Sequence, residues 1–276
     1  MTLEDAINCD GAAKFAAALG KASEAARYAQ RARNYRNLFD PATGFIRGRA
    51  SDGAWRAPFD PLRICNAYAL GGDFTEGNAW QYLWLVPHDV PGLVELLGGR
   101  GKFLAKLEEL FRLPSEPEGQ PKLLDVTGLV GQYAHGNEPS QHIAYLFAQE
   151  GRPERTQELV REICDRFYTL SPDGICGNED NGQMSAWYLF ACLGFYPVDP
   201  VGGTYVLGAP QVPEVTLALP NGKLLAVRAE GLSAANKYVK SVSWNGRPVA
   251  GPTVRHADLV QGGSLVFTMG AAPSGR

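Results

Sequence analysis

The chain has 276 residues, of which 45% are apolar and 20% are charged, so it can bury a sizeable core in one large domain or two ordinary ones. Its net charge of -3 supplies no basic stripe of the kind that follows a phosphate backbone, so we expect no nucleic-acid partner. No run of about 18 apolar residues occurs, and the N-terminus shows no signal peptide, so we expect no membrane-spanning segment. Five scattered cysteines without a CxxC pair argue against a zinc cluster or a disulfide framework.

The N-terminal residues predict a pair of helices followed by a long loop. From residue 10 to 38, apolar and alanine positions repeat every three or four residues, with a junction near Gly20 and Lys21. Residues 40–61 then lose this period and gather Gly, Pro and Asp, which predicts a loop with a hairpin near Asp52 and Gly53.

Helical patterns recur along the next part of the chain, at residues 80–98, 101–113, 140–151, 152–168 and 183–196. Loops rich in Gly, Asn and acid separate them. This rhythm is typical of helix hairpins packed side by side, as in a toroid of paired helices.

The composition changes after Pro200, where apolar and polar residues alternate and Asn-Gly turns follow at Asn221 and Asn245. Both features indicate strands joined by hairpins. We therefore predict a mainly α fold with a helical domain over residues 1–200 and a small β region over residues 201–276.

Three loop-to-helix junctions share one design. Glu76 lies in TEGN, Glu138 in GNEPS, and Glu179 with Asp180 in GNEDNG, each beside Asn and Gly and ahead of an aromatic-containing helix. Helix capping explains any one of them alone, because Asp and Asn favour helix N-termini. Together the three junctions contain more acidic and amide residues than helix capping requires. In a ring of helix hairpins, loops at the same end would face one pocket.

Several carboxylates in one pocket have two chemical uses. One is general acid and base catalysis at a glycosidic bond, which needs one protonated and one ionised carboxyl group. The other is binding of a hard cation such as Ca²⁺, which prefers carboxylate and amide oxygens. The two uses can coexist.

The segments EGNAWQYLWLVPHD, HGNEPSQHIAYLF and GNEDNGQMSAWYLFACLGFYPVDP closely resemble motifs of glycoside hydrolase family 92, the calcium-dependent, exo-acting α-mannosidases. The similarity extends to NYRNLFDPATGFIRGR and YVLGAPQVPEVTLAL, and so covers nearly the whole chain in order. The resemblance implies part of an (α/α)6 toroid, a separate β-sandwich, and hydrolysis of terminal α-linked mannose, α-1,2-linked by expectation, with inversion.

By motif match, Glu76 resembles the general acid and Asp180 the general base. Some family members carry a second Asp where this chain has Asn178, and an amide cannot serve as a base at neutral pH. On this interpretation Asp180 works without that neighbour, and Glu179 orients substrate or water.

The resemblance assigns calcium to the GNEPSQ segment, with Asn137, Glu138 and Gln141 as ligands. The alternative for this segment is a capped helix with Ser140 as N-cap.

The residues that we expect to contact the sugar are Trp80, Asn78, His88, Asp89, Asn178 and Gln183. Trp80 and Trp84 lie four residues apart on one helical face, so one can line the sugar pocket while the other packs. A histidine beside a helix is more often structural. Trp187 and Tyr188 are expected in the core, and Trp55 offers a further platform.

Proteins of the family are longer, and this chain resembles their C-terminal catalytic portion. A second hypothesis is therefore a truncated, non-catalytic fragment that binds calcium or mannosides, or needs a partner chain carrying the missing N-terminal β-sandwich. A third is another inverting glycosidase or a phosphorylase. The expected partner is a mannose-containing oligosaccharide or glycoprotein glycan such as an N-glycan, and the resemblance suggests a secreted or periplasmic location.

Overall fold

The computed structural model describes residues 2–66, 72–116 and 126–274. The chain forms two compact units, residues 1–141 and 142–276. The division falls earlier than the composition change near residue 200, because the helices after residue 142 contact the strands of the second unit. Among the described residues, no helix is both long enough and apolar enough to cross a membrane.

The described part of the first unit consists of helices, the longest of 17 residues, and two-residue strands. In chain order these are α1 Thr2–Ala18, α2 Ala22–Arg31, η1 Asn34–Leu38, β1 Phe39–Asp40, β2 Phe45–Ile46, β3 Cys65–Asn66, β4 Glu76–Gly77, α3 Ala79–Tyr82, η2 Pro87–Asp89, α4 Val90–Leu96, α5 Arg100–Leu110, β5 Leu129–Val130, β6 Tyr133–Ala134 and η3 Glu138–Ser140. Antiparallel hairpins pair β1 with β2, β3 with β4, and β5 with β6.

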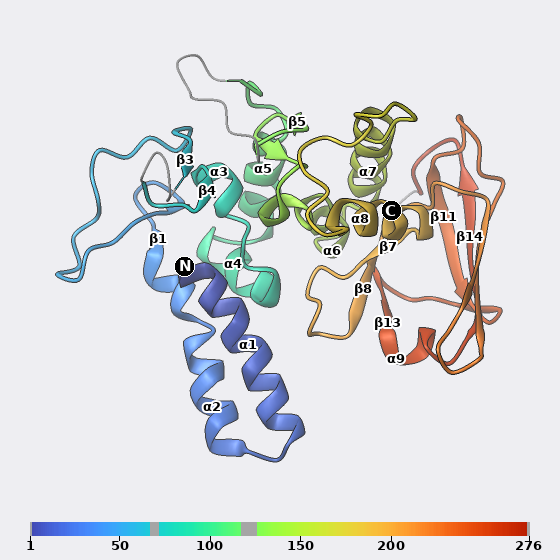
Figure 1. The fold of residues 1–276 in the computed structure, drawn as a ribbon, viewed down its shortest axis with the longest axis horizontal. Helices are drawn as coiled ribbons and strands as arrows, with labels where there is room; N and C mark the ends of the chain where they lie inside the picture. Colours follow the sequence, from blue (N-terminus) through green and yellow to red (C-terminus); the bar gives the residue numbers. More distant parts are fainter. Residues whose placement is uncertain (1, 67–71, 117–125, 275–276) are drawn as a thin grey trace. The chain divides into compact units, whose positions relative to one another are not determined.

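The predicted helix pair at the N-terminus is confirmed: α1 and α2 form an antiparallel hairpin (Figure 1). Gly20 closes the turn at φ 71°, a left-handed conformation that glycine adopts without a steric penalty. The long loop that follows carries the expected turn at Asp52 and Gly53, with Arg49 and Trp55 bridged across it.

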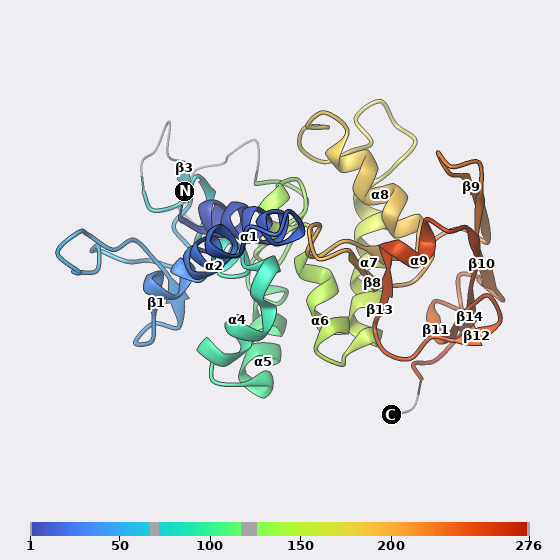
Figure 2. The ribbon, with the colours of Figure 1, turned by 90° about the horizontal axis from the view of Figure 1, so that it is seen from below.

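The predicted helix over residues 80–98 is divided into three pieces, α3, η2 and α4. Pro87 and Pro91 cause this division, because proline lacks the N–H that an uninterrupted helix needs. Further along, α5 confirms the helix predicted for residues 101–113, and Figure 2 shows α4 and α5 side by side.

Among the described residues, the second unit contains all of the strands longer than two residues. Its elements are η4 Ile143–Tyr145, α6 Leu146–Gln149, α7 Pro153–Phe167, α8 Gln183–Leu193, β7 Phe195–Tyr196, β8 Thr204–Leu207, β9 Glu214–Ala218, β10 Leu224–Glu230, β11 Tyr238–Trp244, β12 Arg247–Pro248, β13 Thr253–Arg255, α9 His256–Leu259 and β14 Gly263–Gly270. The helices predicted at residues 152–168 and 183–196 are confirmed, whereas residues 140–151 form only short 3₁₀ and α turns.

A five-stranded sheet, ordered β12-β11-β14-β10-β9, holds the core of this unit. Its antiparallel hairpins turn at the two predicted Asn-Gly pairs, and β10 pairs with β14 in parallel. Alternation along β10 and β14 buries one face of the sheet, through Leu225, Val227, Ala229, Leu265, Phe267 and Met269. A second, three-stranded sheet has the order β13-β8-β7.

Candidate active site

Glu76 lies in the short strand β4, half-buried, opposite Asn66 of β3. Both peptide groups of the residue are bonded to side chains. The Glu76 N–H donates to the Tyr82 hydroxyl at 3.2 Å, and the Glu76 carbonyl accepts a 2.8 Å bond from Nδ2 of Asn137. The backbone that carries the predicted acid is thus fixed from two sides.

A capping box follows immediately after Glu76. The Asn78 side chain accepts from the backbone N–H of Gln81, and the Gln81 side chain accepts from the backbone N–H of Asn78. Gly77, which lies between Glu76 and Asn78, has φ 155°. A Cβ at this position would lie 2.5 Å from Oε1 of Gln81, so the turn requires glycine. Asn78 is completely buried, and these contacts assign it a capping role.

Gln132, at the tip of the β5–β6 hairpin, connects this capping box to the next motif. Its Oε1 accepts a 2.8 Å bond from Nδ2 of Asn78, and its backbone carbonyl accepts a 3.1 Å bond from Nε2 of Gln81. All three side chains are buried, and a fully satisfied amide network of this kind fixes one arrangement of its members.

The GNEPSQ segment forms the 3₁₀ turn η3. Asn137 and Gln141 are buried, and Glu138 is exposed. Ser140 lies inside the turn rather than at a helix N-cap, and its buried hydroxyl has no hydrogen-bond partner among the described residues. Amide oxygens, one exposed carboxylate and an unsatisfied hydroxyl form a donor set of the hardness that Ca²⁺ prefers.

His135 is buried directly before this turn, and its Nδ1 lies 2.8 Å from the Tyr133 hydroxyl. Burial lowers the pKa of His135 to about 3, so the imidazole is neutral at physiological pH. A neutral, buried histidine of this kind is a structural group.

The Trp80 indole is 5% exposed and is enclosed by first-unit side chains. Phe45 meets it edge-on at a centroid separation of 4.9 Å, and Nζ of Lys106 lies 4.3 Å from the ring centroid. Trp84 is completely buried. These contacts account for both tryptophans as packing residues, and the sugar contact of Trp80 stays a prediction.

His88 and Asp89 are bound to the N-terminal helical region. His88 Nε2 lies 3.0 Å from the Ala32 carbonyl, and the Tyr35 hydroxyl donates to Asp89 at 2.6 Å. Asp89 also caps α4 by accepting from the Gly92 N–H at 3.0 Å. Both half-buried side chains therefore have structural partners.

The third motif, residues 177–182, is an exposed loop in the second unit. Asp180 and Asn181 have φ values of 49° and 56°, and Gly182 follows at 95°. Asp and Asn tolerate this left-handed region better than other non-glycine residues. The loop thus projects Asp180 from a tight, left-handed turn directly before α8, while Gln183 is the first residue of that helix and is half-buried.

Glu179 is turned back toward α8. Its Oε1 accepts a 3.2 Å hydrogen bond from the Ser185 N–H, and its carbonyl accepts from the N–H groups of Gly182 and Met184. Glu179 therefore supplies the acceptor that a free helix N-terminus needs. Asn178 is exposed beside it.

Sequence reasoning did not identify Tyr82 and Gln132, although both contact the Glu76 region. The signal for Gln132 was a glutamine between apolar residues in LVGQYAH, because a buried polar residue in such a setting must have partners. Tyr82 shares its apolar-looking segment with two tryptophans, and its pairing with the Glu76 N–H depends on a tight turn that only coordinates reveal.

A polar pocket of about 320 Å³ lies on the first unit beside the Glu76 strand. Its lining includes Thr75 and Tyr82, together with the charged residues Arg47, Arg56 and Asp73.

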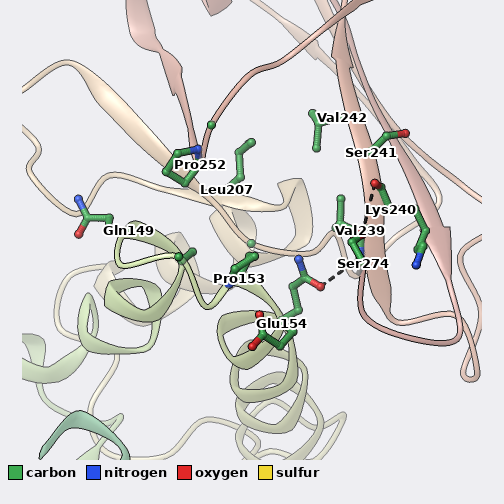
Figure 3. Close-up of a pocket in the computed structure, with 15 residues that line it drawn as sticks. Gln149, Pro153, Glu154, Leu207, Val239, Lys240, Ser241, Val242, Pro252 and Ser274 are labelled. Carbon is green, nitrogen blue, oxygen red and sulfur yellow. Dashed lines mark hydrogen bonds between the residues drawn. The ribbon is translucent and has the colours of Figure 1, made fainter. Parts of the chain in front are cut away.

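A second pocket, of about 390 Å³, lies within the second unit between the start of α7 and β11 (Figure 3). Its polar side chains already make structural bonds: Gln157 accepts from the Val239 N–H, and Lys240 Nζ donates to the Ala272 and Pro273 carbonyls. None of the predicted site residues is among the described side chains that line it. This pocket is thus a feature of the helix–sheet junction.

The chain is similar to solved glycosidase structures over nearly its whole length. A family GH92 α-mannosidase from Bacteroides thetaiotaomicron, in complex with mannoimidazole, matches 99% of the chain at 39% identity and a TM-score of 0.93, with 36% of that protein covered. A family GH92 inverting mannosidase from the same organism matches 99% at 40% identity and a TM-score of 0.86, with 37% covered. An uncharacterized secreted glycosidase of Arthroderma benhamiae is 27% identical over 93% of the chain and 33% of its own length.

These comparisons define the class, a glycoside hydrolase fold. The profile of the glycosyl hydrolase family 92 catalytic domain matches residues 1–271, and the chain belongs to that family. It spans about a third of the length of these relatives.

Proposed function

We propose that the protein carrying this chain hydrolyses terminal α-linked mannose from glycans. The observation that supports this most strongly is the match of 99% of the chain to an α-mannosidase bound to mannoimidazole. The relative described as an inverting mannosidase supports an inverting reaction. The proposal includes the expected (α/α)6 toroid, of which this chain would form a part. We extend the proposal to exo-action on α-1,2 linkages of N-glycans by an exported enzyme.

In this mechanism Glu76 protonates the leaving oxygen, and Asp180 removes a proton from the attacking water. Inversion requires the two carboxyl groups on opposite faces of the sugar ring, about 6.5–9.5 Å apart in inverting enzymes generally. Glu76 is suited to a fixed acid because both of its peptide groups are bonded. Asp180 projects from the exposed turn, while Glu179 maintains the helix behind it.

We further propose that Asn137, Glu138 and Gln141 hold Ca²⁺, with the Ser140 hydroxyl as an added donor. The buried, unsatisfied Ser140 oxygen supports this assignment, because such an atom in a native fold generally has a partner. Bound calcium would supply electrostatic attraction for vicinal sugar hydroxyls. The residues of this chain would orient that pair of hydroxyls relative to Glu76.

The test is mannose release from α-1,2-mannobiose by the chain, by E76Q and by D180N, each with Ca²⁺ and with EDTA. We expect turnover that calcium supports and that both substitutions abolish while the fold, measured by circular dichroism, is retained. Undiminished activity of E76Q would remove Glu76 from the acid role. Full activity in EDTA would remove calcium.

A second function, supported by the coverage of only about a third of the relatives, is a sugar- or calcium-binding part that needs further protein to turn over substrate. Mannose binding by the isolated chain without hydrolysis, observed by calorimetry, would favour this function. Hydrolysis by the isolated chain would exclude it.

A further inference from the structure

The side-chain amide of Asn137 has a defined orientation. A carbonyl oxygen can only accept a hydrogen bond, so the atom that faces the Glu76 carbonyl at 2.8 Å must be the donor Nδ2. The Asn137 Oδ1 is the end of the amide that this bond does not use. Asn137 is 4% exposed, so water competes little for the bond.

This bond acts on the backbone of a residue whose other peptide group is also held. The Glu76 N–H donates to the Tyr82 hydroxyl, and the Glu76 carbonyl accepts from Asn137. Strand β4 is only two residues long, so its pairing with β3 gives little rigidity. The two side-chain bonds therefore fix the position of the Glu76 backbone more than the strand pairing does.

We propose that Asn137 is a positioning residue for Glu76: its Nδ2 holds the backbone of strand β4, which carries the acid, and its Oδ1 stays available to the cation. The inference rests on the proposed function of Glu76, and it adds a task that is separate from metal binding. Small displacements of a catalytic group reduce turnover strongly, so loss of this bond should lower kcat more than it changes KM.

The decisive variant is N137D, which keeps the oxygen available to a cation and puts a second carboxylate oxygen, in place of the N–H donor, against the Glu76 carbonyl. At neutral pH two acceptors then oppose each other. Burial and this repulsion raise the pKa of the new carboxyl group, and its protonated form can donate to the Glu76 carbonyl again. The positioning role therefore predicts that the kcat of N137D, relative to that of wild type, rises as the pH falls.

A role only in calcium binding predicts the opposite trend. Carboxylate binds Ca²⁺ more strongly than an amide does, and protonation removes that advantage, so the variant would become worse as the pH falls. The sign of the pH dependence thus separates the two roles.

Several other titratable groups lie near this bond, namely Glu76, Glu138, His135, Tyr82, Cys65 on the paired strand, and Glu4 beside Thr75. Wild type and variant share these groups, so each rate of the variant is compared with that of wild type at the same pH. His135, with its pKa of about 3, and Tyr82, whose pKa burial raises, keep one protonation state between about pH 4.5 and 7.5.

We expect the kcat of N137D relative to wild type to rise about tenfold or more from pH 7.5 to 4.5, with KM nearly constant. A structural readout that needs no turnover is hydrogen exchange of the peptide over residues 72–80. At pH 7.5 this peptide should exchange several-fold faster in N137D than in wild type. At pH 4.5 the two proteins should exchange at nearly the same rate.

Q132E is the matched control, because it places a carboxylate at a similarly buried site but leaves the bond between Asn137 and Glu76 intact. Its exchange over residues 72–80 should stay near wild type at both pH values, because the oxygen that accepts from Asn78 is retained and the lost donor faced the Pro114 carbonyl. Y82F is the second variant: it removes the hydroxyl that holds the Glu76 N–H and should accelerate exchange in the same peptide at every pH, even if N137D does not fold.

The outcomes are separable from those of the proposed function. Wild-type exchange rates for folded N137D at pH 7.5, or a relative rate of N137D that falls with pH, would overturn the positioning role. Absence of mannosidase activity in wild type would refute the proposed function of this chain, and the exchange experiment would still decide whether Asn137 holds the Glu76 strand.

Discussion

Oε1 of Glu179 accepts a hydrogen bond from the Ser185 N–H at 3.2 Å, six residues along the chain and inside the first turns of α8. Its neighbour Asp180 has left-handed backbone geometry in the same loop. Two adjacent carboxylates thus have different surroundings. Glu179 is hydrogen-bonded to the start of α8, and Asp180 lies in the exposed turn. This difference is consistent with different tasks for the two groups.

We expect E179A to lower the free energy of unfolding by about 1 kcal/mol, the usual effect of losing a helix-terminal acceptor, whereas E179Q retains an acceptor and changes it by a few tenths. Urea denaturation measures both. In mannoside hydrolysis E179Q should keep most of its turnover while D180N loses it. Equal loss in the two variants would show that Glu179 takes part in the chemistry.

His135 should make the first unit sensitive to acid. Its folded-state pKa is about 3 and an unfolded histidine has a pKa of about 6.5, so between these values only the unfolded state binds the proton. The free energy of unfolding should therefore fall as the pH falls below 6.5, by at most about 1.4 kcal/mol per pH unit.

The measurement for His135 is urea denaturation from pH 7 to pH 4.5. H135N should show a shallower pH dependence, although it is less stable at pH 7. H256N, which changes an exposed histidine on α9, serves as control and should keep the wild-type slope. An unchanged slope in H135N would contradict the assignment.

Local signals in the sequence predicted much of the second unit. Residues 152–168 have a strong helical period, and α7 occupies them; the Asn-Gly pairs define hairpin turns, with Asn245 at φ 50° as a tight turn requires. The parallel pairing of β10 with β14 was not predictable. These strands are separated by β11, β12 and β13 along the chain, and no local pattern specifies which distant strand fills the centre of a sheet.

The candidate site was likewise only partly predictable from local sequence signals. The sequence predicts a site at the loops of Glu76, Glu138 and Asp180, because acidic and amide residues cluster there before helices, and this assignment stays a prediction. It did not reveal that Asn78 serves a capping box or that Trp80 lies against Lys106. Both outcomes depend on partners that are distant in sequence, and a motif alone does not distinguish a buried side chain from one that faces a ligand.

Lys106 offers a test of this buried environment. Its Nζ lies 3.7 Å from the Phe45 ring centroid and 4.3 Å from that of Trp80, and desolvation lowers the pKa of Lys106 while Glu109 partly opposes the shift. Because the folded-state pKa is below the unfolded value, the unfolded state binds more protons as the pH approaches about 10.4. The contribution of Lys106 to stability should therefore increase with pH in this window.

K106M retains the apolar stem and removes the titration. The difference in free energy of unfolding between wild type and K106M should shift in favour of wild type from pH 8 to pH 10. K102M, at an exposed position of the same helix, controls for the general loss of a surface charge. A constant difference for K106M across this range would contradict a desolvated Lys106.

The junction of α7 with the sheet should depend on two side-chain bonds of α7. Oε1 of Gln157 accepts from the Val239 N–H at 3.1 Å, and Glu158 accepts from the Tyr238 hydroxyl at 2.7 Å, which also raises the pKa of that phenol. Q157A leaves the Val239 N–H without this acceptor, so we expect a loss of about 1–3 kcal/mol in the free energy of unfolding.

Y238F should have a smaller effect than Q157A, about 1 kcal/mol, because phenylalanine preserves the packing and removes one hydrogen bond. Q157E is the matched control for Gln157, since it keeps an acceptor for the Val239 N–H and should recover most of the stability lost in Q157A. Thermal or urea unfolding of the four proteins measures these differences. If Q157A and Q157E were equally destabilised, the effect would come from loss of the amide donor rather than from the bond to Val239.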